Sequence, residues 1–212
     1  MGDFRNLFRI TCRAGLLSIG ILLLSACHSE PPWATKNITG LMPTLEFTLT
    51  EANRNKIVHA QDYRGEILLM YFGYTHCPDV CPLTLSRLKS ALAKLGDAAQ
   101  QVRVLFVSVD PGRDSIEDLK RYTEYFGPEV LGLRGDQTAL RELTKKYRVT
   151  YGYNKPNANG DYDVSHSSAV YVFDRKGEAR LLIRPTDAVA SISIDLKRLL
   201  TEGIPVASQS KQ

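Results

Sequence analysis

A nearly uninterrupted apolar run, residues 66–74 (EILLMYFGY), ends just before two cysteines, Cys77 and Cys81. A run of this kind, with no polar alternation, is typical of a central strand that is buried on both faces of its sheet. The segment 83–96 repeats leucines at helical spacing and stops at a glycine, and Pro82 suits the first turn of a helix. The sequence therefore predicts a strand, a cysteine pair and a helix in direct succession.

The remaining segments alternate between strand and helix patterns. Expected strands cover 45–49, 56–60, 102–110, 130–135 and two stretches of 169–185, which flank the turn 175–177. Expected helices cover 115–126, 136–149 and 188–200, with Ser115 and Asp136 as the N-caps of the first two. This order predicts an α/β fold with a mostly parallel central sheet, helices on both faces and a C-terminal antiparallel hairpin. The succession of strand, cysteine pair and helix resembles the arrangement in thioredoxin, so we expect a thioredoxin-like fold.

The N-terminus has the plan of an export signal. Three arginines, Arg5, Arg9 and Arg13, precede an uncharged apolar run at 14–24, which is shorter than the roughly 18 residues needed to span a bilayer. The run ends in LSAC, whose last residue is Cys27. This resembles a bacterial lipobox and implies that Cys27 is lipidated, with an uncleaved hydrophobic anchor as the alternative. We therefore expect a periplasm-facing protein of the bacterial cell envelope, lipid-anchored to one of its membranes.

The export signal sets the domain organisation and the cysteine count. We expect a signal peptide at 1–26, a lipid-anchored tether at 27–40, the domain at 41–203 and a disordered tail at 204–212. Because Cys12 would leave with the signal and Cys27 would carry lipid, Cys77 and Cys81 can pair only with each other. Loss of three arginines and Asp3 lowers the formal net charge from +4 to +2, which argues against a nucleic-acid partner. A monomer is expected.

The cysteine pair has three readings: a structural disulfide, a redox couple and a metal site. A disulfide that closes so short a loop stabilises a fold poorly, and it needs neither His76 nor Asp79 beside it. A thiol–disulfide exchanger usually separates its cysteines by two residues, whereas three separate them here, and the proline that guides disulfide substrates in thioredoxin-like folds is missing near residue 166. At a helix N-terminus both thiols are expected to be acidic. As a helical i, i+4 pair, their Cα atoms are expected about 6 Å apart, which permits a disulfide.

A histidine, His166, stands just before a strongly apolar strand and is the expected third ligand of a metal site. Two thiolates and one imidazole favour copper, or zinc where the geometry allows it. His76 is the alternative ligand, although it would have to share the metal with its direct neighbour Cys77. His59, in an expected edge strand, fits a surface or packing position, and His28 lies in the tether.

Two carboxylates and one loop are expected to support this site. Asp79 lies between the cysteines, and Asp110 ends a strand that neighbours the cysteine-bearing one; both are expected to orient ligands without touching the metal. A simple turn is the alternative role of Asp110. The segment 151–163 is expected to form an inserted loop or hairpin that carries His166 on its far side.

Three motifs carry a resemblance to a known family: FGYTHCPDVCP at 72–82, SVDPGRDS at 108–115 and HSSAVYVFD at 166–174. Together they resemble the Sco (SenC) family of copper-binding thioredoxin-fold proteins, over a region from about Leu45 to Leu200. The departures from the family pattern leave the ligand positions intact and lie at Gly112, Ser115 and Ser165.

The resemblance implies that Cys77, Cys81 and His166 bind one copper ion, as Cu(I) or Cu(II). It also implies a metallochaperone, not an enzyme, that delivers copper to the binuclear copper site of cytochrome c oxidase. The implied partners are the oxidase subunit that holds this site and another exported copper carrier or thiol reductant. Two other functions use the same cysteines. One is a thiol–disulfide oxidoreductase that reduces the oxidase cysteines, and the other is a thiol peroxidase, which the spacing of Thr75 from Cys77 disfavours.

Overall fold

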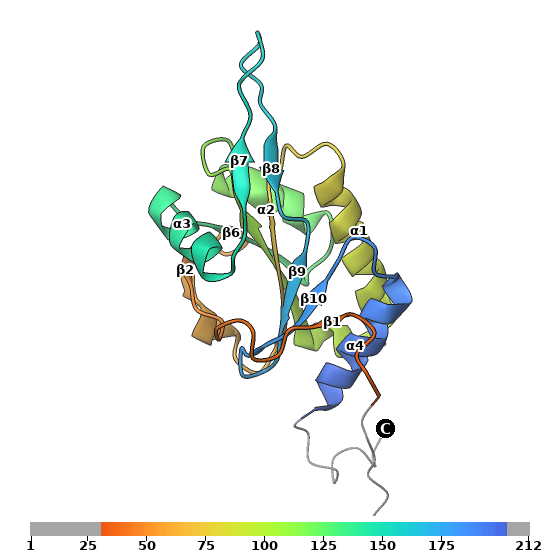
Figure 1. Ribbon diagram of the computed structural model, residues 1–212. Coiled ribbons are helices and arrows are strands. Elements are labelled where there is room, and N and C mark those ends of the chain that lie inside the picture. Colours follow the sequence, from red (N-terminus) through yellow and green to blue (C-terminus); the bar gives the residue numbers. More distant parts are fainter. Residues whose placement is uncertain (1–30, 203–212) are drawn as a thin grey trace, which may run out of the picture. The chain divides into compact units, whose positions relative to one another are not determined.

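The computed structural model describes residues 31–202 (Figure 1). The chain divides into two compact units, 1–32 and 33–212. The predicted signal peptide, the predicted lipidation site Cys27 and the predicted tail at 204–212 lie outside the described residues. Within the described part of the chain, no helix combines the length and the apolar character that crossing a membrane requires.

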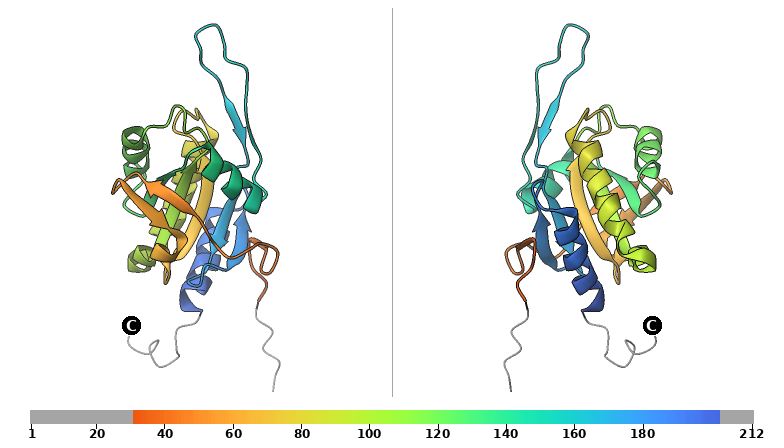
Figure 2. Two further views of the ribbon diagram at one scale, coloured as in Figure 1. Left: turned by 90° about the vertical axis from the view of Figure 1, so that its left-hand side faces the viewer. Right: turned by 90° about the vertical axis from the view of Figure 1, so that its right-hand side faces the viewer.

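An eight-stranded sheet forms the centre of the domain, in the order β1-β10-β9-β4-β5-β6-β2-β3. Its strands are β1 (Lys36–Asn37), β2 (Thr48–Glu51), β3 (Lys56–His59), β4 (Ile67–Gly73), β5 (Val102–Ser108), β6 (Val130–Arg134), β9 (Val170–Phe173) and β10 (Ala179–Ile183). A separate two-stranded sheet joins β7 (Tyr151–Tyr153) to β8 (Val164–His166) as an antiparallel hairpin. Figures 1 and 2 show this hairpin projecting from the rest of the domain.

The predicted α/β fold is confirmed, but the sheet is mixed and not mostly parallel, because parallel pairing is confined to its centre. β4 pairs in parallel with β5, and β5 with β6. Antiparallel strands flank this centre on both sides. β9 and β10 form the expected C-terminal hairpin, which pairs with β4, and the β2–β3 hairpin adds to β6. Every residue of β4 is buried, as its apolar sequence predicts.

Helices cover both faces of the sheet, as expected (Figure 2). They are α1 (Val80–Ala93), α2 (Ile116–Glu124), α3 (Gln137–Lys146) and α4 (Val189–Thr201), with short 3-10 helices η1 (Ala60–Tyr63) and η2 (Gly96–Gln101). α1 packs against α4, and on the same face Tyr122 of α2 contacts Phe106 of β5. On the opposite face Tyr147, which ends α3, packs edge-on against Phe173 of β9. The expected N-caps Ser115 and Asp136 accept backbone hydrogen bonds in the first turns of α2 and α3.

The domain begins earlier than predicted, because part of the expected tether 27–40 is folded. The backbone N–H and hydroxyl of Thr35 both donate to the Asp195 carboxylate in α4, each at 2.7 Å. The Arg198 guanidinium lies 3.9 Å from the centre of the Trp33 ring, and β1 pairs with β10. The compact unit therefore starts at Trp33 and not at residue 41.

Candidate metal centre

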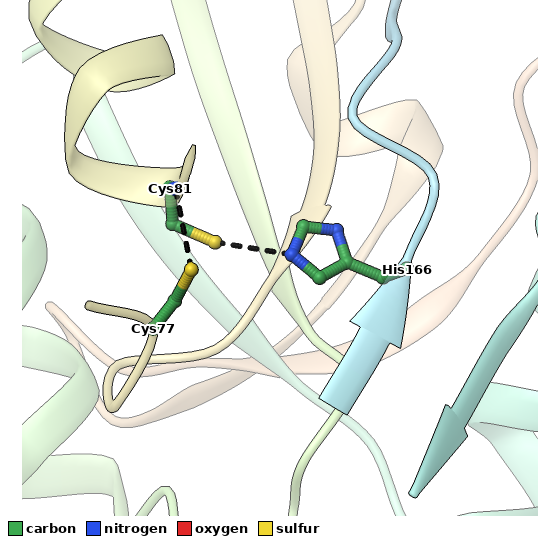
Figure 3. A group of neighbouring side chains, drawn as sticks. All are labelled: Cys77, Cys81 and His166. Atoms are coloured by element: carbon green, nitrogen blue, oxygen red, sulfur yellow. Dashed lines mark hydrogen bonds between the residues drawn. The ribbon is translucent and has the colours of Figure 1, made fainter. Parts of the chain in front are cut away.

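Three side chains from two distant parts of the chain converge at the carboxyl end of β4 (Figure 3). Cys77 lies in the loop after β4, Cys81 in the first turn of α1, and His166 at the end of β8. Their potential ligand atoms all lie within 4.8 Å of one another, and Cys81 Sγ is 3.3 Å from His166 Nε2. The structure thus brings together the three residues that the sequence predicted as ligands.

The two cysteines do not share a helical turn, which corrects the expected i, i+4 helical pair. α1 begins only at Val80, with Asp79 as its N-cap, so Cys77 precedes the helix. The next residue, Pro78, disfavours a helical backbone at Cys77. The loop instead folds back over the helix N-terminus, where the Cys81 backbone N–H donates to Cys77 Sγ at 3.4 Å.

The two thiols differ in protonation. A hydrogen bond from the Cys81 thiol, with help from the backbone N–H groups of Cys81 and Asp79, lowers the pKa of Cys77 to about 4 against the opposing effect of burial. The Cys77 thiolate and burial raise the pKa of Cys81 far above its usual range. Without metal the pair therefore holds one thiolate and one thiol, and only Cys77 matches the expectation of an acidic thiol at a helix N-terminus.

The imidazole of His166 is oriented with one nitrogen toward the sulfurs. Its Nδ1 lies 3.0 Å from the carbonyl oxygen of Ser167, and because a carbonyl only accepts, Nδ1 carries the proton. Nε2 is left with its lone pair toward Cys81. The ring is also held edge-on by Tyr74 and Tyr71, at centroid distances of 5.9 and 6.1 Å. A fixed tautomer and orientation of this kind are typical of metal-ligating histidines.

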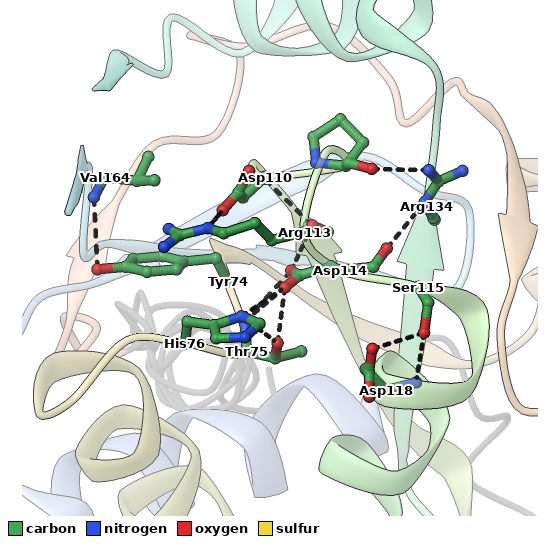
Figure 4. Close-up of polar contacts among 12 residues, drawn as sticks. Tyr74, Thr75, His76, Asp110, Arg113, Asp114, Ser115, Asp118, Arg134 and Val164 are labelled. Carbon is green, nitrogen blue, oxygen red and sulfur yellow. Dashed lines mark hydrogen bonds and ion pairs between the residues drawn. The ribbon is translucent and has the colours of Figure 1, made fainter. Parts of the chain in front are cut away.

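The two other histidines of the described residues, His59 and His76, point elsewhere. His76 directs Nδ1 toward the buried Asp114 carboxylate, at 3.5 Å, and does not belong to the ligand cluster of the described residues (Figure 4). His59 is exposed at the end of the edge strand β3, where its ring contacts the Thr48 hydroxyl at 3.0 Å. The alternative in which His76 replaces His166 therefore has no support from the geometry.

The two predicted supporting carboxylates have different surroundings. Asp110 is 1 % exposed and accepts hydrogen bonds from Arg113 and from the Tyr162 hydroxyl, the latter at 2.9 Å. Asp79 is exposed, and its side chain makes no capping hydrogen bond to α1. Asp110 therefore belongs to a hydrogen-bond network that extends to the hairpin. Asp79 instead helps to lower the pKa of Cys77 through its backbone N–H.

A further buried carboxylate, Asp114, was not predicted from the sequence. It accepts hydrogen bonds from the Thr75 hydroxyl at 2.6 Å, from the Thr75 backbone N–H at 3.2 Å and from the Ser108 hydroxyl at 2.6 Å (Figure 4). Thr75 lies two residues before Cys77, so Asp114 ties the cysteine loop to the end of β5. The sequence offers one hint of its role, because Asp114 is the second aspartate of the motif at 108–115. Unlike Asp110, however, it does not directly follow an apolar strand pattern.

The donor set fits copper. Two sulfurs and one imidazole nitrogen are soft and borderline ligands, which copper accepts in three-coordinate sites. Ligand atoms at roughly 2.0–2.3 Å from a metal lie within about 4 Å of one another. The present spacing, within 4.8 Å, requires only a small closure. A cleft of about 360 Å³, lined by Pro78, Val80 and Ser168 among others, opens beside Cys77 and His166 and leaves the cluster accessible from one side.

The fold and the cluster define a thioredoxin-like domain with two cysteines and one histidine gathered at the end of its central strand, in an arrangement that could hold a metal ion. The chain belongs to the SCO1/SenC family, whose model matches residues 41–201. The mitochondrial SCO2 homologue of Bos taurus is 36 % identical over 134 residues, which cover 62 % of this chain and 50 % of that protein. The human SCO2 homologue is 39 % identical over 118 residues, covering 55 % and 44 %. The chain thus spans about half the length of these relatives.

Solved structures of the family agree with this assignment. ScoI of Bradyrhizobium japonicum with copper bound is 35 % identical, with a TM-score of 0.67, and the match covers 74 % of this chain and 98 % of that one. Yeast Sco1 with copper bound is 28 % identical, with a TM-score of 0.69 and coverage of 81 % and 95 %. Both matches extend over nearly the whole of the solved chains.

Proposed function

We propose that this protein is a copper metallochaperone that binds one copper ion through Cys77, Cys81 and His166 and delivers it to the binuclear copper site of cytochrome c oxidase. The observation that carries the proposal is the convergence of two sulfurs and an imidazole nitrogen within 4.8 Å. The copper-bound structures of the related ScoI and Sco1 proteins support the choice of metal.

The surroundings of the cluster favour transfer of the ion over storage. Three protein ligands leave copper open to an incoming thiolate, and the cleft beside Cys77 gives a partner access. Two thiolates with Cu(I) carry a net charge of −1, which the N-terminus of α1 stabilises. Copper is therefore cargo that the ligands of an acceptor site can take up by ligand exchange.

A transfer experiment tests the proposal. The full-length protein, reduced and loaded with one equivalent of Cu(I), is mixed with the metal-free copper-binding domain of an oxidase subunit, and copper in each protein is measured after separation. We expect copper to move to the oxidase domain from the native protein. Retention of all copper by the donor, or failure of the reduced protein to bind copper at all, would contradict the proposal.

A thiol–disulfide oxidoreductase is the second candidate, because an acidic Cys77 beside a protonated Cys81 is also what thiol exchange requires. The two functions differ in their need for His166. A reductase keeps its exchange rate in His166→Ala, whereas a copper carrier loses affinity and transfer. A thiol peroxidase has less support, because the Thr75 hydroxyl is engaged by Asp114.

We also propose that Cys27 is lipidated and holds the domain at a membrane on the periplasmic side. The support is the LSAC tetrapeptide at the end of the apolar run. The Cys27→Ser variant is expected to lose incorporation of a fatty-acid analogue in cells, while the purified protein binds copper as before. Persistent label in Cys27→Ser would contradict the assignment.

A further inference from the structure

A group of three side chains connects the His166 hairpin to the loop that follows β5. The Tyr162 hydroxyl, four residues before His166, donates to Asp110 Oδ1 at 2.9 Å. Arg113 donates from Nε to the other oxygen of the same carboxylate, and its guanidinium carbon lies 3.6 Å from the centre of the Tyr162 ring. The three residues therefore contact one another pairwise, with one buried carboxylate at the centre.

Further contacts join the hairpin to the same end of the sheet. The Tyr153 hydroxyl donates to the carbonyl oxygen of Val109 at 2.7 Å, and the backbone N–H of Val164 donates to the Tyr74 hydroxyl at 3.4 Å. The Arg113 guanidinium lies 5.7 Å from the centre of the Tyr74 ring (Figure 4). These contacts bring the histidine-bearing strand to the ends of β4 and β5, which also hold the cysteine loop.

Apart from these contacts, Val164 is the one residue of β7 and β8 that is buried in the core. Only three residues of β7 pair with three of β8, and residues 153–161 are exposed. A two-stranded hairpin of this length is marginally stable by itself. The position of His166 relative to the sulfurs therefore depends on the side chains that join the hairpin to the domain.

We propose that Asp110, Arg113 and Tyr162 form a latch that positions His166 as the third copper ligand. The inference rests on the proposed copper site and adds three positioning residues to it. The loop 110–114 then supports both parts of the site. Asp110 holds the hairpin with His166 through Tyr162, and Asp114 holds the cysteine loop through Thr75.

The latch should matter more for Cu(II) than for Cu(I). Two thiolates alone hold Cu(I), whereas Cu(II) favours nitrogen and higher coordination and so depends on a well-placed imidazole. Loss of residues that orient metal ligands typically lowers metal affinity by about 10-fold to 100-fold. Opening the latch should therefore lower the Cu(II) affinity within this range and leave the Cu(I) affinity nearly unchanged.

The test compares Tyr162→Phe, which removes only the hydroxyl, with the control Tyr125→Phe at a tyrosine that is 79 % exposed. Hydrogen exchange of the metal-free, full-length protein is measured by mass spectrometry, and Cu(II) binding by its thiolate charge-transfer spectrum. In Tyr162→Phe we expect faster exchange over 151–166, a shifted Cu(II) spectrum and Cu(II) affinity lowered by about 10-fold or more. Tyr125→Phe should match the native protein in all three.

A second variant, Asp110→Asn, tests whether the Tyr162 hydroxyl and the Asp110 carboxylate act through the hydrogen bond between them. If they do, the double variant with Tyr162→Phe loses little more Cu(II) affinity than the weaker-binding single variant. Native exchange and spectra in Tyr162→Phe would contradict the latch, as would a lower unfolding temperature with an unchanged Cu(II) spectrum. Should the native protein itself bind no copper, the proposed function is overturned, and the exchange measurement still tests the latch.

Discussion

The Nε2 atom of His166 lies 3.3 Å from the Sγ atom of Cys81, although 85 residues separate them in the chain. With the Nδ1 proton donated to the Ser167 carbonyl, this nitrogen has its lone pair toward a protonated thiol. The arrangement suits metal binding, which would require a small closure of the three ligand atoms and loss of the Cys81 proton.

The thiolate of Cys77 should be detectable by its reactivity. Because its pKa is lowered to about 4, labelling of Cys77 by iodoacetamide is expected to stay nearly constant from pH 8 to pH 5. An ordinary thiol, with a pKa near 8.5, slows about tenfold per pH unit over this range. Peptide mass spectrometry distinguishes Cys77 from the buried Cys81. The urea-unfolded protein is the control, and the same steep pH dependence in the folded protein would contradict the lowered pKa.

This ionisation also links stability to pH. Since folding lowers the pKa of Cys77, its contribution to the stability of the reduced protein is complete above the pKa of an unfolded cysteine. The contribution declines below that value and is lost as the pH falls through about 4. Urea unfolding of the reduced native protein and of Cys77→Ser should therefore differ in pH dependence between pH 4 and pH 8, and parallel curves would exclude the linkage.

The two histidines near the cysteines should differ in their effect on copper. His166→Ala is expected to remove the Cu(II)–thiolate charge-transfer band and to lower Cu(II) affinity by more than about 100-fold, exceeding the usual effect of an orienting residue. A weaker Cu(I) site with two thiolates should remain. His76→Ala is the matched control, since its ring faces Asp114. Loss of the band in His76→Ala with retention in His166→Ala would reverse the ligand assignment.

Much of this fold could be predicted from local patterns. The buried run became β4, and Ser115 and Asp136 cap the helices that they precede in the sequence, because these features depend on neighbouring residues alone. The folded start at Trp33 could not be predicted, since its partners lie in β10 and α4, more than 140 residues away.

In the candidate site, too, local sequence features could be predicted, whereas contacts that form only on folding could not. Cys77, Cys81 and His166 were predictable because their residue types and spacing indicate metal chemistry. The helical placement of Cys77 was wrong, because the loop at Pro78 turns back over the helix N-terminus before α1 begins. Asp114 escaped prediction because its partners Thr75 and Ser108 meet it only in the folded chain.

Asp114 should stabilise the fold as well as the cysteine loop. Asp114→Ala removes the acceptor of the buried Ser108 hydroxyl and of the half-buried Thr75 hydroxyl, and an unsatisfied buried donor costs about 1–3 kcal/mol. We expect urea unfolding to show a loss of about 2–4 kcal/mol. The exposed Asp97→Ala should change stability by no more than about 0.5 kcal/mol. Equal losses in the two variants would contradict the role given to Asp114.

The space behind Cys81 is fully occupied, which makes Gly73 a sensitive position. A Cβ atom at Gly73 would lie 2.6 Å from Phe106 Cε2 and 2.8 Å from Cys81 Sγ. Gly73→Ala is therefore expected to cost about 1–3 kcal/mol and to weaken copper binding by moving the sulfur. Gly112→Ala is the control, because a Cβ atom there would lie no closer than 3.7 Å to its nearest neighbour, Asp110 Oδ1. Native stability and copper affinity in Gly73→Ala would show that the sulfur is not confined.

The central claim is tested most directly by one copper titration on the full-length protein in two redox states. The reduced protein should bind one Cu(I) per chain, and the protein with a Cys77–Cys81 disulfide should bind none until it is reduced again, because the same sulfurs serve both bonds. Cys81→Ser should behave like the oxidised protein. If the oxidised protein bound copper as tightly as the reduced one, the ligands would lie elsewhere and the cysteine pair would be a structural disulfide.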